Sequence, residues 1–221
     1  DKFMSKEIGF IFDLDGVIVD TAKYHYLAWK NLANSLGFNF TEEQNELLKG
    51  VSRVKSLEIL LELGKVELSE EKKQPLLVKK NKEYLEYVYK MTADEILPGV
   101  NQLLTFLEEN NIKFALGSAS KNAPLILEKV GLIKRFTAIV DGNDVSKAKP
   151  NPEVFLLGTQ KLNMKPENCV VFEDAIAGVQ AANAAKMISI GIGDAKVLSE
   201  ADYVFENMAA VTPYFLKNLI N

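Results

Sequence analysis

Two aspartates, Asp13 and Asp15, stand two positions apart at the end of the first strongly apolar run, in the stretch FIFDLDG. Side chains two positions apart on an extended strand point to the same side, so both carboxylates can address one ligand. Two close carboxylates repel each other unless a cation is bound or one of them takes up a proton. The pair therefore predicts a metal site or acid–base chemistry, although Asp15 with Gly16 alone also fits an ordinary turn.

Further polar residues follow later apolar runs in the same way. Ser118 follows FALG, Lys149 lies in KAKPNP directly before a helical pattern, and Glu173 with Asp174 follows VVF. Taken singly, the serine fits a turn, the lysine a solvated surface charge, and the acidic pair the start of a helix. If the runs are strands of one parallel sheet, their carboxyl ends share an edge where these polar groups converge.

The apolar runs that must position these residues are short and are bounded by Gly, Asp, Ser or Asn. This pattern is typical of strands that are covered on both faces. Helical patterns separate the runs from about residue 92 onward, and such alternation predicts a parallel sheet with right-handed crossovers. We therefore predict an α/β fold, a Rossmann-like parallel sheet core with helices on both faces. The expected strands are 8–12, 114–117, 138–140, 170–172 and 187–190.

The segment 17–91 has a different character, because it contains several helical patterns and no convincing strand. We predict that it forms an inserted α-helical cap domain, and that 1–16 and 92–221 together form the α/β core. Pro75 is expected to kink or break the last cap helix near its start.

Composition limits the possible partners and the compartment. The chain has 221 residues, of which 48% are apolar, and a net charge of −4. It therefore lacks the basic excess that binding to a nucleic acid or an anionic membrane requires. There is no apolar run of membrane-spanning length and no signal-peptide pattern, and the single Cys169 fits a reducing compartment as a buried apolar residue. We expect a cytoplasmic monomer whose partner is a small molecule, with no nucleic acid and no membrane.

Four runs, DLDGVIVDT, GSAS, KAKPNP and FEDAIAG, resemble in this order the motifs of the haloacid dehalogenase superfamily of phosphotransferases, with a helical cap inserted after the first strand. The resemblance covers essentially the whole chain. Within the superfamily, the runs DTAKYHYLAW, KGVSR, KKN and SASKN are similar to the cap and joining loops of the β-phosphoglucomutase subfamily. Leu47 departs from that pattern, because the subfamily often carries a polar glutamine there.

The resemblance implies a role for each polar residue of the core. Asp13 would be the nucleophile, since an aspartate carboxylate is ionised at neutral pH and needs no base to activate it. Asp15 would be the general acid and base. Ser118 and Lys149 would donate hydrogen bonds to the phosphoryl oxygens. The implied ligands of a Mg²⁺ cofactor are Asp13, the backbone carbonyl of Asp15, Asp174 and the nearby Glu173.

The resemblance also implies a subsite for the second, non-reacting phosphate of a sugar bisphosphate, with Arg53 as its bidentate donor. His25 would pair with Lys80 and couple substrate binding to the orientation of Asp15, although a purely structural histidine fits equally well. Trp29 fits the cap core better than a sugar platform. The full candidate substrate-binding set is His25, Trp29, Lys49, Gly50, Val51, Ser52, Arg53, Lys80, Ser120, Lys121 and Asn122.

Together these roles imply a phosphomutase that interconverts β-D-glucose 1-phosphate and glucose 6-phosphate through β-glucose 1,6-bisphosphate and a phospho-aspartate intermediate. A sugar-phosphate phosphatase of the same superfamily is the alternative, because water could take the phosphoryl group from the same core motifs. Arg53, Lys121 and Asn122 favour the mutase, since they offer a second phosphate a place to bind. A non-catalytic sugar-phosphate sensor would not need both Asp13 and Asp15.

Overall fold

The computed structural model describes residues 7–49 and 51–221. The chain forms two compact units, one made of the chain up to Asp20 together with Thr92–Asn221, the other of Thr21–Met91. The stretch 17–20, which we assigned to the cap, belongs to the first unit. The side chains of residues 17–19 are fully buried, and the carbonyl of Ile18 accepts a hydrogen bond from the Leu97 amide at 2.9 Å.

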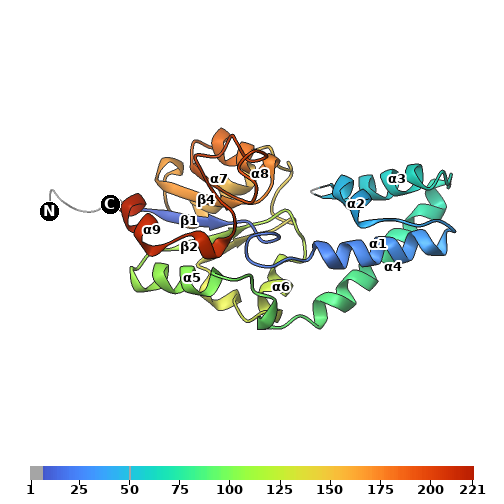
Figure 1. Cartoon of the computed structure of the whole chain (residues 1–221), viewed down its shortest axis with the longest axis horizontal. Coiled ribbons are helices and arrows are strands. Elements are labelled where there is room, and N and C mark those ends of the chain that lie inside the picture. The colour runs from blue at the N-terminus through green and yellow to red at the C-terminus, as the bar shows by residue number, and fades with distance from the viewer. Residues whose placement is uncertain (1–6, 50) are drawn as a thin grey trace. The chain divides into compact units, whose positions relative to one another are not determined.

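The first unit is built on a six-stranded sheet with strand order β3-β2-β1-β4-β5-β6, in which every pair is parallel (Figure 1). The predicted parallel α/β fold is therefore confirmed. One strand was not predicted from the sequence: β6, a three-residue edge strand that begins at Tyr203, which is 43% exposed. The strands are β1 Gly9–Phe12, β2 Phe114–Gly117, β3 Ala138–Val140, β4 Cys169–Glu173, β5 Ile188–Ile192 and β6 Tyr203–Phe205.

Strand β1 lies between β2 and β4, and all its residues are buried. Phe12 pairs in register with Phe172 of β4, and their rings stack with centroids 5.0 Å apart. Phe114 of β2 packs edge-on against Phe12, with ring centroids 6.0 Å apart. Because aromatic side chains bury large apolar areas, these contacts hold the three central strands in register. The residues that follow β1 and β4 therefore emerge at the same level of the sheet.

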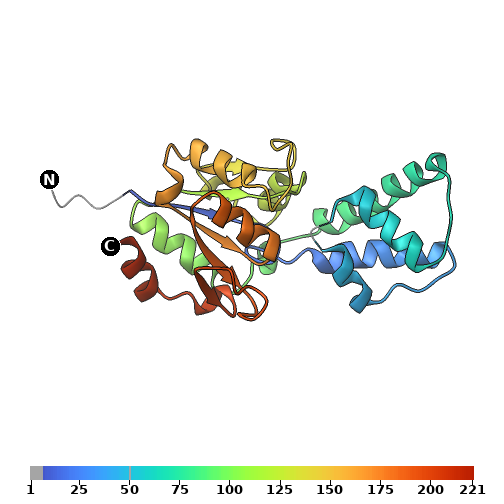
Figure 2. The same cartoon turned by 90° about the horizontal axis from the view of Figure 1, so that it is seen from above.

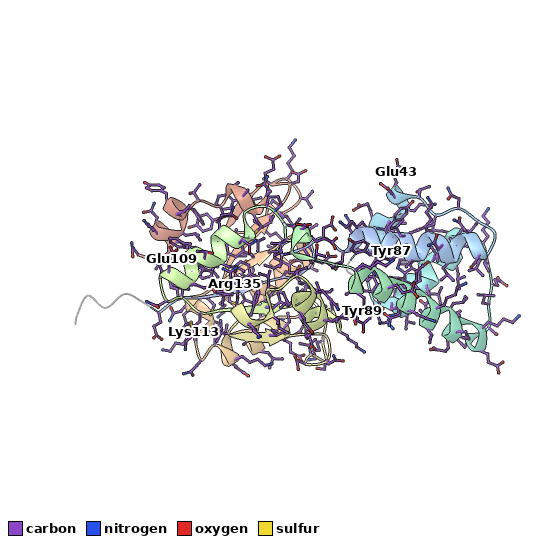
Figure 3. All side chains as sticks on the ribbon, turned by 90° about the horizontal axis from the view of Figure 1, so that it is seen from below. Glu43, Tyr87, Tyr89, Glu109, Lys113 and Arg135 are labelled. Carbon is purple, nitrogen blue, oxygen red and sulfur yellow. The ribbon has the colours of Figure 1, made fainter. Side chains whose placement is uncertain are left out.

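Helices cover both faces of this sheet (Figures 1 and 2). On one face, α7 and α8 pack on the strands through a buried cluster that includes Ile11, Phe155 and Ala181, while α5 lies on the other face (Figure 1). Arg135, labelled in Figure 3, fastens the segment after α6 to α5 by donating to Glu108 and to Asn101 Oδ1. The helices are α5 Val100–Glu109, α6 Ala123–Lys129, α7 Glu153–Lys161, α8 Ile176–Ala184 and α9 Pro213–Ile220.

Within its described residues, the second unit contains helices joined by loops and no strand. Its apolar core includes Trp29, Phe40, Leu57, Leu60 and Leu77. Tyr24 of α1 also stacks on Tyr87 of α4, with ring centroids 5.3 Å apart. Tyr87 is labelled in Figure 3. The helices of this unit are α1 Ala22–Ser35, α2 Glu42–Asn45, α3 Arg53–Leu63 and α4 Glu70–Tyr89.

Pro75 lies inside α4, and the helix continues on both sides of it. The expected break is absent here because the ring removes only one hydrogen bond near the start of a long helix, whose face of Leu77, Tyr84 and Val88 is buried.

Short 3₁₀ helices occur at Glu46–Leu48, Ala93–Glu95, Ile133–Arg135, Pro166–Asn168 and Met208–Ala210. Within the described parts of the chain, no helix is long and apolar enough to cross a membrane.

Candidate active site

Three predicted site residues lie at the carboxyl ends of neighbouring strands. Asp13 directly follows β1, Ser118 directly follows β2, and Glu173 is the last residue of β4. The Asp13 amide donates to the Phe172 carbonyl at 3.0 Å, so the ladder between β1 and β4 extends one residue into the site. The Ser118 amide likewise donates to the carbonyl of Val140, at the end of β3. The sheet therefore fixes the backbone of these residues at one edge.

Lys149 joins this group from the loop between β3 and α7. Its ammonium donates to Asp13 Oδ1 at 3.0 Å, to Glu173 Oε2 at 2.7 Å and to the Gly117 carbonyl at 3.3 Å. Burial by itself would lower the pKa of Lys149, but the negative charges of Asp13 and Glu173 outweigh that effect and raise it above its usual value. The lysine is therefore a fixed positive charge in the site.

Asp13, Glu173 and Asp174 each present a carboxylate oxygen, and these oxygens all lie within 4.8 Å of one another. The pKa of Glu173 is raised to about 7, mainly by burial and next by repulsion from Asp13. Burial and repulsion from both neighbours raise the pKa of Asp174 to about 10. Asp174 is exposed to solvent, and the negative charges of Asp13 and Glu173 oppose its ionisation. A divalent cation would relieve this repulsion, and oxygen ligands are those that Mg²⁺ prefers, so the cluster fits a metal of that kind.

Gly16, expected from the sequence only as a turn residue, and Gly178, which was not expected to matter, make room for the acidic cluster. A Cβ atom on Gly16, whose φ is +83°, would lie 2.0 Å from Asp174 Oδ2. A Cβ atom on Gly178, in the first turn of α8, would lie 1.9 Å from the Glu173 Cδ atom. Both glycines belong to the runs DLDG and FEDAIAG, which were the available signal. Side chains at either position would displace a carboxylate of the cluster.

Asp15 lies half-buried in a tight loop directly after β1. The Gly16 amide donates to the Val19 carbonyl at 2.7 Å, and the Ile18 amide donates to the Leu14 carbonyl at 2.9 Å. The Asp15 carboxylate is not part of the three-carboxylate cluster. That its backbone carbonyl contributes to a metal site stays a prediction.

The segment after β2 is held by its own serine hydroxyls. Ser118 Oγ accepts from the Ser120 amide at 3.0 Å, and Ser120 Oγ accepts from the Asn122 amide at 3.1 Å. The Gly142 amide donates to the Ser120 carbonyl at 3.1 Å. Lys121 lies in the same loop and is exposed. The structure thus places Ser118 and the predicted residues 120–122 in one ordered loop at the carboxyl end of β2.

In the cap unit, His25 and Lys80 form a close pair, with 2.7 Å between Nδ1 and Nζ. The imidazole stacks on Tyr84 at a centroid distance of 3.9 Å, and the ammonium lies 4.6 Å from the centre of the Trp29 ring. Burial and the charge of Lys80 lower the pKa of His25 well below its usual value, so the imidazole is neutral. Burial and the charge of Arg53 lower the pKa of Lys80 to about 7. Trp29 itself is part of the buried apolar core.

The other cap candidates surround the start of α3. Ser52 caps this helix by accepting from the Lys55 amide at 3.2 Å, and Arg53 is its exposed first residue. The carbonyl of Val51 accepts from Ser56 Oγ at 3.4 Å. Lys49 pairs with Glu46 on the surface, Leu47 is 55% exposed, and Gly50 lies outside the described residues.

Known proteins share this architecture and these motifs. The family model of haloacid dehalogenase-like hydrolases matches residues 9–186. The chain is 42% identical to the β-phosphoglucomutase of Bacillus subtilis, over 91% of this chain and 90% of that protein. It is also 33% identical to a phosphorylated carbohydrates phosphatase of Thermotoga maritima, over 95% of this chain and 96% of that one.

Among solved structures, the crystal structure of a β-phosphoglucomutase from Clostridium difficile superimposes with a TM-score of 0.88. The two chains are 41% identical, and the match covers 96% of each. The resemblance predicted from the four motifs is therefore confirmed. By its sequence, its fold and the acidic edge of its sheet, this chain belongs to the haloacid dehalogenase-like hydrolase family.

Proposed function

We propose that this protein is a phosphomutase that interconverts β-D-glucose 1-phosphate and glucose 6-phosphate through β-glucose 1,6-bisphosphate. The observation that carries the proposal is the group of Asp13, Lys149 and Glu173, held by hydrogen bonds at one sheet edge in a chain 42% identical to a β-phosphoglucomutase. Cys169, the single cysteine, supports a cytoplasmic enzyme.

Asp13 is the proposed phosphoryl acceptor. One of its carboxylate oxygens attacks the phosphorus atom and forms a new O–P bond, while the bond between phosphorus and the sugar oxygen breaks. The product on Asp13 is an acyl phosphate. Lys149, whose ammonium already contacts Asp13 Oδ1, would donate to the transferring oxygens, and the Ser118 hydroxyl would do the same. Because Lys149 stays charged, it stabilises negative charge on these oxygens throughout the transfer.

Asp15 is the proposed general acid and base. It would protonate the leaving sugar oxygen in the first transfer and take a proton from the attacking sugar hydroxyl in the second. Its place directly after β1, two positions from Asp13, supports this role.

Mg²⁺ is the proposed cofactor, held by Asp13, Asp174, the backbone carbonyl of Asp15 and the nearby Glu173. When bound, it would neutralise part of the charge that opposes the approach of a carboxylate to an anionic phosphate. The close oxygens of the acidic cluster support this choice of ligands.

The substrate contacts of the cap are likewise a proposal that the likeness to β-phosphoglucomutases supports. Arg53 would bind the phosphate that is not reacting, with Ser120, Lys121 and Asn122 completing that subsite. His25 and Lys80 would couple substrate binding to Asp15. The remaining residues proposed to line the sugar site are Trp29, Lys49, Gly50, Val51 and Ser52.

A sugar-phosphate phosphatase remains the second candidate, and the likeness to the Thermotoga maritima phosphatase favours it. In that case water would take the phosphoryl group from Asp13. The deciding experiment incubates the protein with Mg²⁺ and β-glucose 1-phosphate, primed with a trace of the bisphosphate, and follows glucose 6-phosphate and free phosphate together. We expect glucose 6-phosphate as the main product, whereas stoichiometric release of free phosphate would decide for the phosphatase.

A further inference from the structure

The loop that carries Lys149 follows Val145, which packs against the core of the first unit, and the Ala148 carbonyl accepts from the Asn151 amide at 3.0 Å. Ser146, Lys147 and Ala148 are exposed. Lys149 nevertheless has to keep its ammonium within hydrogen-bond distance of Asp13 and Glu173. An exposed loop gains little from burial, so specific polar contacts have to hold it.

Glu153, the first residue of α7, makes such contacts. Its Oε1 accepts from the Ser146 amide at 2.8 Å, and its Oε2 accepts from the Lys147 amide at 3.1 Å. The Ser146 hydroxyl lies 3.0 Å from Oε2 and 3.2 Å from Oε1. The hydrogen bond from the Ser146 amide is the main cause that lowers the pKa of Glu153, and the bond from the Ser146 hydroxyl adds to it. The Glu153 carboxylate is therefore ionised at neutral pH and can accept all of these hydrogen bonds.

The helix that carries Glu153 is firmly anchored. Val154 and Phe155, the next residues of α7, are buried in the core on one face of the sheet. The Phe155 ring lies 4.9 Å from the Lys149 ammonium. After the lysine, Asn151 Oδ1 accepts from the Glu153 amide at 3.0 Å. The start of α7 therefore holds the chain both before and after Lys149.

We propose that Glu153 is a positioning residue for phosphoryl transfer, which clamps the loop 146–149 to α7 and so keeps the Lys149 ammonium between Asp13 and Glu173. The inference rests on the proposed function only in taking Lys149 as a donor to the transferring phosphoryl group. Displacement of a charged donor by about 1 Å can cost up to roughly a hundredfold in rate, so a small movement of the loop is sufficient to matter.

The first test is the substitution Glu153→Gln, in which an NH₂ group, a donor, replaces one of the two accepting oxygens. We expect kcat to fall about tenfold to a hundredfold while KM changes less than about threefold, because the lost contact acts on the transition state. Glu167→Gln is the matched control, since Glu167 precedes β4 at the opposite edge of the sheet. Equal kcat values for Glu153→Gln and the parent would overturn the proposal.

A double substitution separates positioning from a loss of stability. If Glu153 acts through Lys149, then adding Glu153→Gln to Lys149→Ala should change the remaining turnover by less than about twofold. If the effect of Glu153→Gln is the same in both backgrounds, the carboxylate acts by another route and the proposal is wrong.

A third measurement does not depend on activity, so it still tests the clamp if the proposed function fails. Lysine labelled with ¹⁵N should show a protected ammonium signal for Lys149, assigned by its loss in Lys149→Ala. We expect Glu153→Gln to broaden or shift this signal and Glu167→Gln to leave it in place. An unchanged Lys149 signal in Glu153→Gln would contradict the proposal that Glu153 clamps the loop. If the parent protein transfers no phosphoryl group in the activity assay, that result would contradict only the proposed function.

Discussion

The Lys149 ammonium lies 2.7 Å from Glu173 Oε2, and this contact ties the loop before α7 to the end of β4. The same ammonium reaches Asp13, which lies 136 positions away in the sequence. Because Glu173 also accepts from the amides of Asp174 and Ala175, its carboxylate has little freedom to move. Changes that displace Glu173 should therefore disturb the charges of the whole site.

Gly178→Ala should reduce turnover, although alanine in a helix normally stabilises a protein by roughly 0.5–1 kcal/mol relative to glycine. The new Cβ atom would lie 1.9 Å from Glu173 Cδ, so the carboxylate has to shift, which disturbs its contact with Lys149. We expect kcat to fall at least about tenfold. The control is Gly158→Ala in α7, where the new atom would meet only the flexible end of Ile11, at 2.8 Å. Similar kcat values for the two variants would show that the position of Glu173 is not critical.

Asp13→Asn should abolish turnover while leaving the fold intact, because an amide cannot accept the phosphoryl group as the carboxylate does. We expect a loss of more than about a thousandfold in kcat, measured beside the thermal unfolding midpoint. Removal of divalent cations with a chelator should stop the parent enzyme, and added Mg²⁺ should restore it. Substantial turnover in the variant would rule out Asp13 as the acceptor.

Asp15→Asn should slow sugar turnover and lengthen the life of phosphorylated Asp13, since the proposed base that activates the next acceptor is missing. Mass spectrometry after exposure to acetyl phosphate measures the decay of the phospho-enzyme directly. Equal lifetimes in the parent and the variant would count against this role of Asp15.

Arg53→Ala should lower mutase kcat/KM by about thirtyfold to a thousandfold, the range expected for loss of a bidentate phosphate contact. Hydrolysis of acetyl phosphate should hardly change, because this donor has no second phosphate. Lys55→Ala on the same helix is the control, since Lys55 is exposed and pairs only loosely with Glu58, at 3.6 Å. A parallel fall of both activities in Arg53→Ala would instead indicate damage to the fold or to the core site.

Lys80 should make the stability of the cap depend on pH. Burial lowers the pKa of Lys80 from 10.5 to about 7 in the folded protein. Between pH 7 and pH 10.5 the unfolded chain keeps a proton on Lys80 that the folded protein has released. The free energy of unfolding therefore rises with pH over this range, and the contribution of Lys80 totals on the order of a few kcal/mol. Lys80→Met removes this titration. The stability of the parent minus that of the variant should therefore increase from pH 7 to pH 10, and a flat difference in denaturant unfolding would contradict the assignment.

Much of the fold followed from local patterns in the sequence. Five of the six strands were predicted because their apolar runs are short and are bounded by turn residues. The third of them, at Ala138–Val140, was identified in spite of its short length. The edge strand at Tyr203–Phe205 was missed, since an exposed edge needs no continuous apolar run. Pro75 was expected to kink or break a helix, and the helix continues through it without a break, because tertiary packing of the same helix outweighed the cost of one missing hydrogen bond.

The sequence by itself determined which groups are available for chemistry, because Asp13, Ser118, Lys149 and Glu173 each follow or precede a recognisable element. Tertiary structure decided how they meet. The contacts from Lys149 to Asp13 and Glu173, the space that Gly16 and Gly178 leave, and the hold of Glu153 on the loop 146–149 all join residues that no local pattern relates. The physical reason is that periodicity and turn preferences act over a few neighbouring residues, whereas hydrogen bonds, charge and excluded volume act between whatever groups the packed sheet and helices bring together.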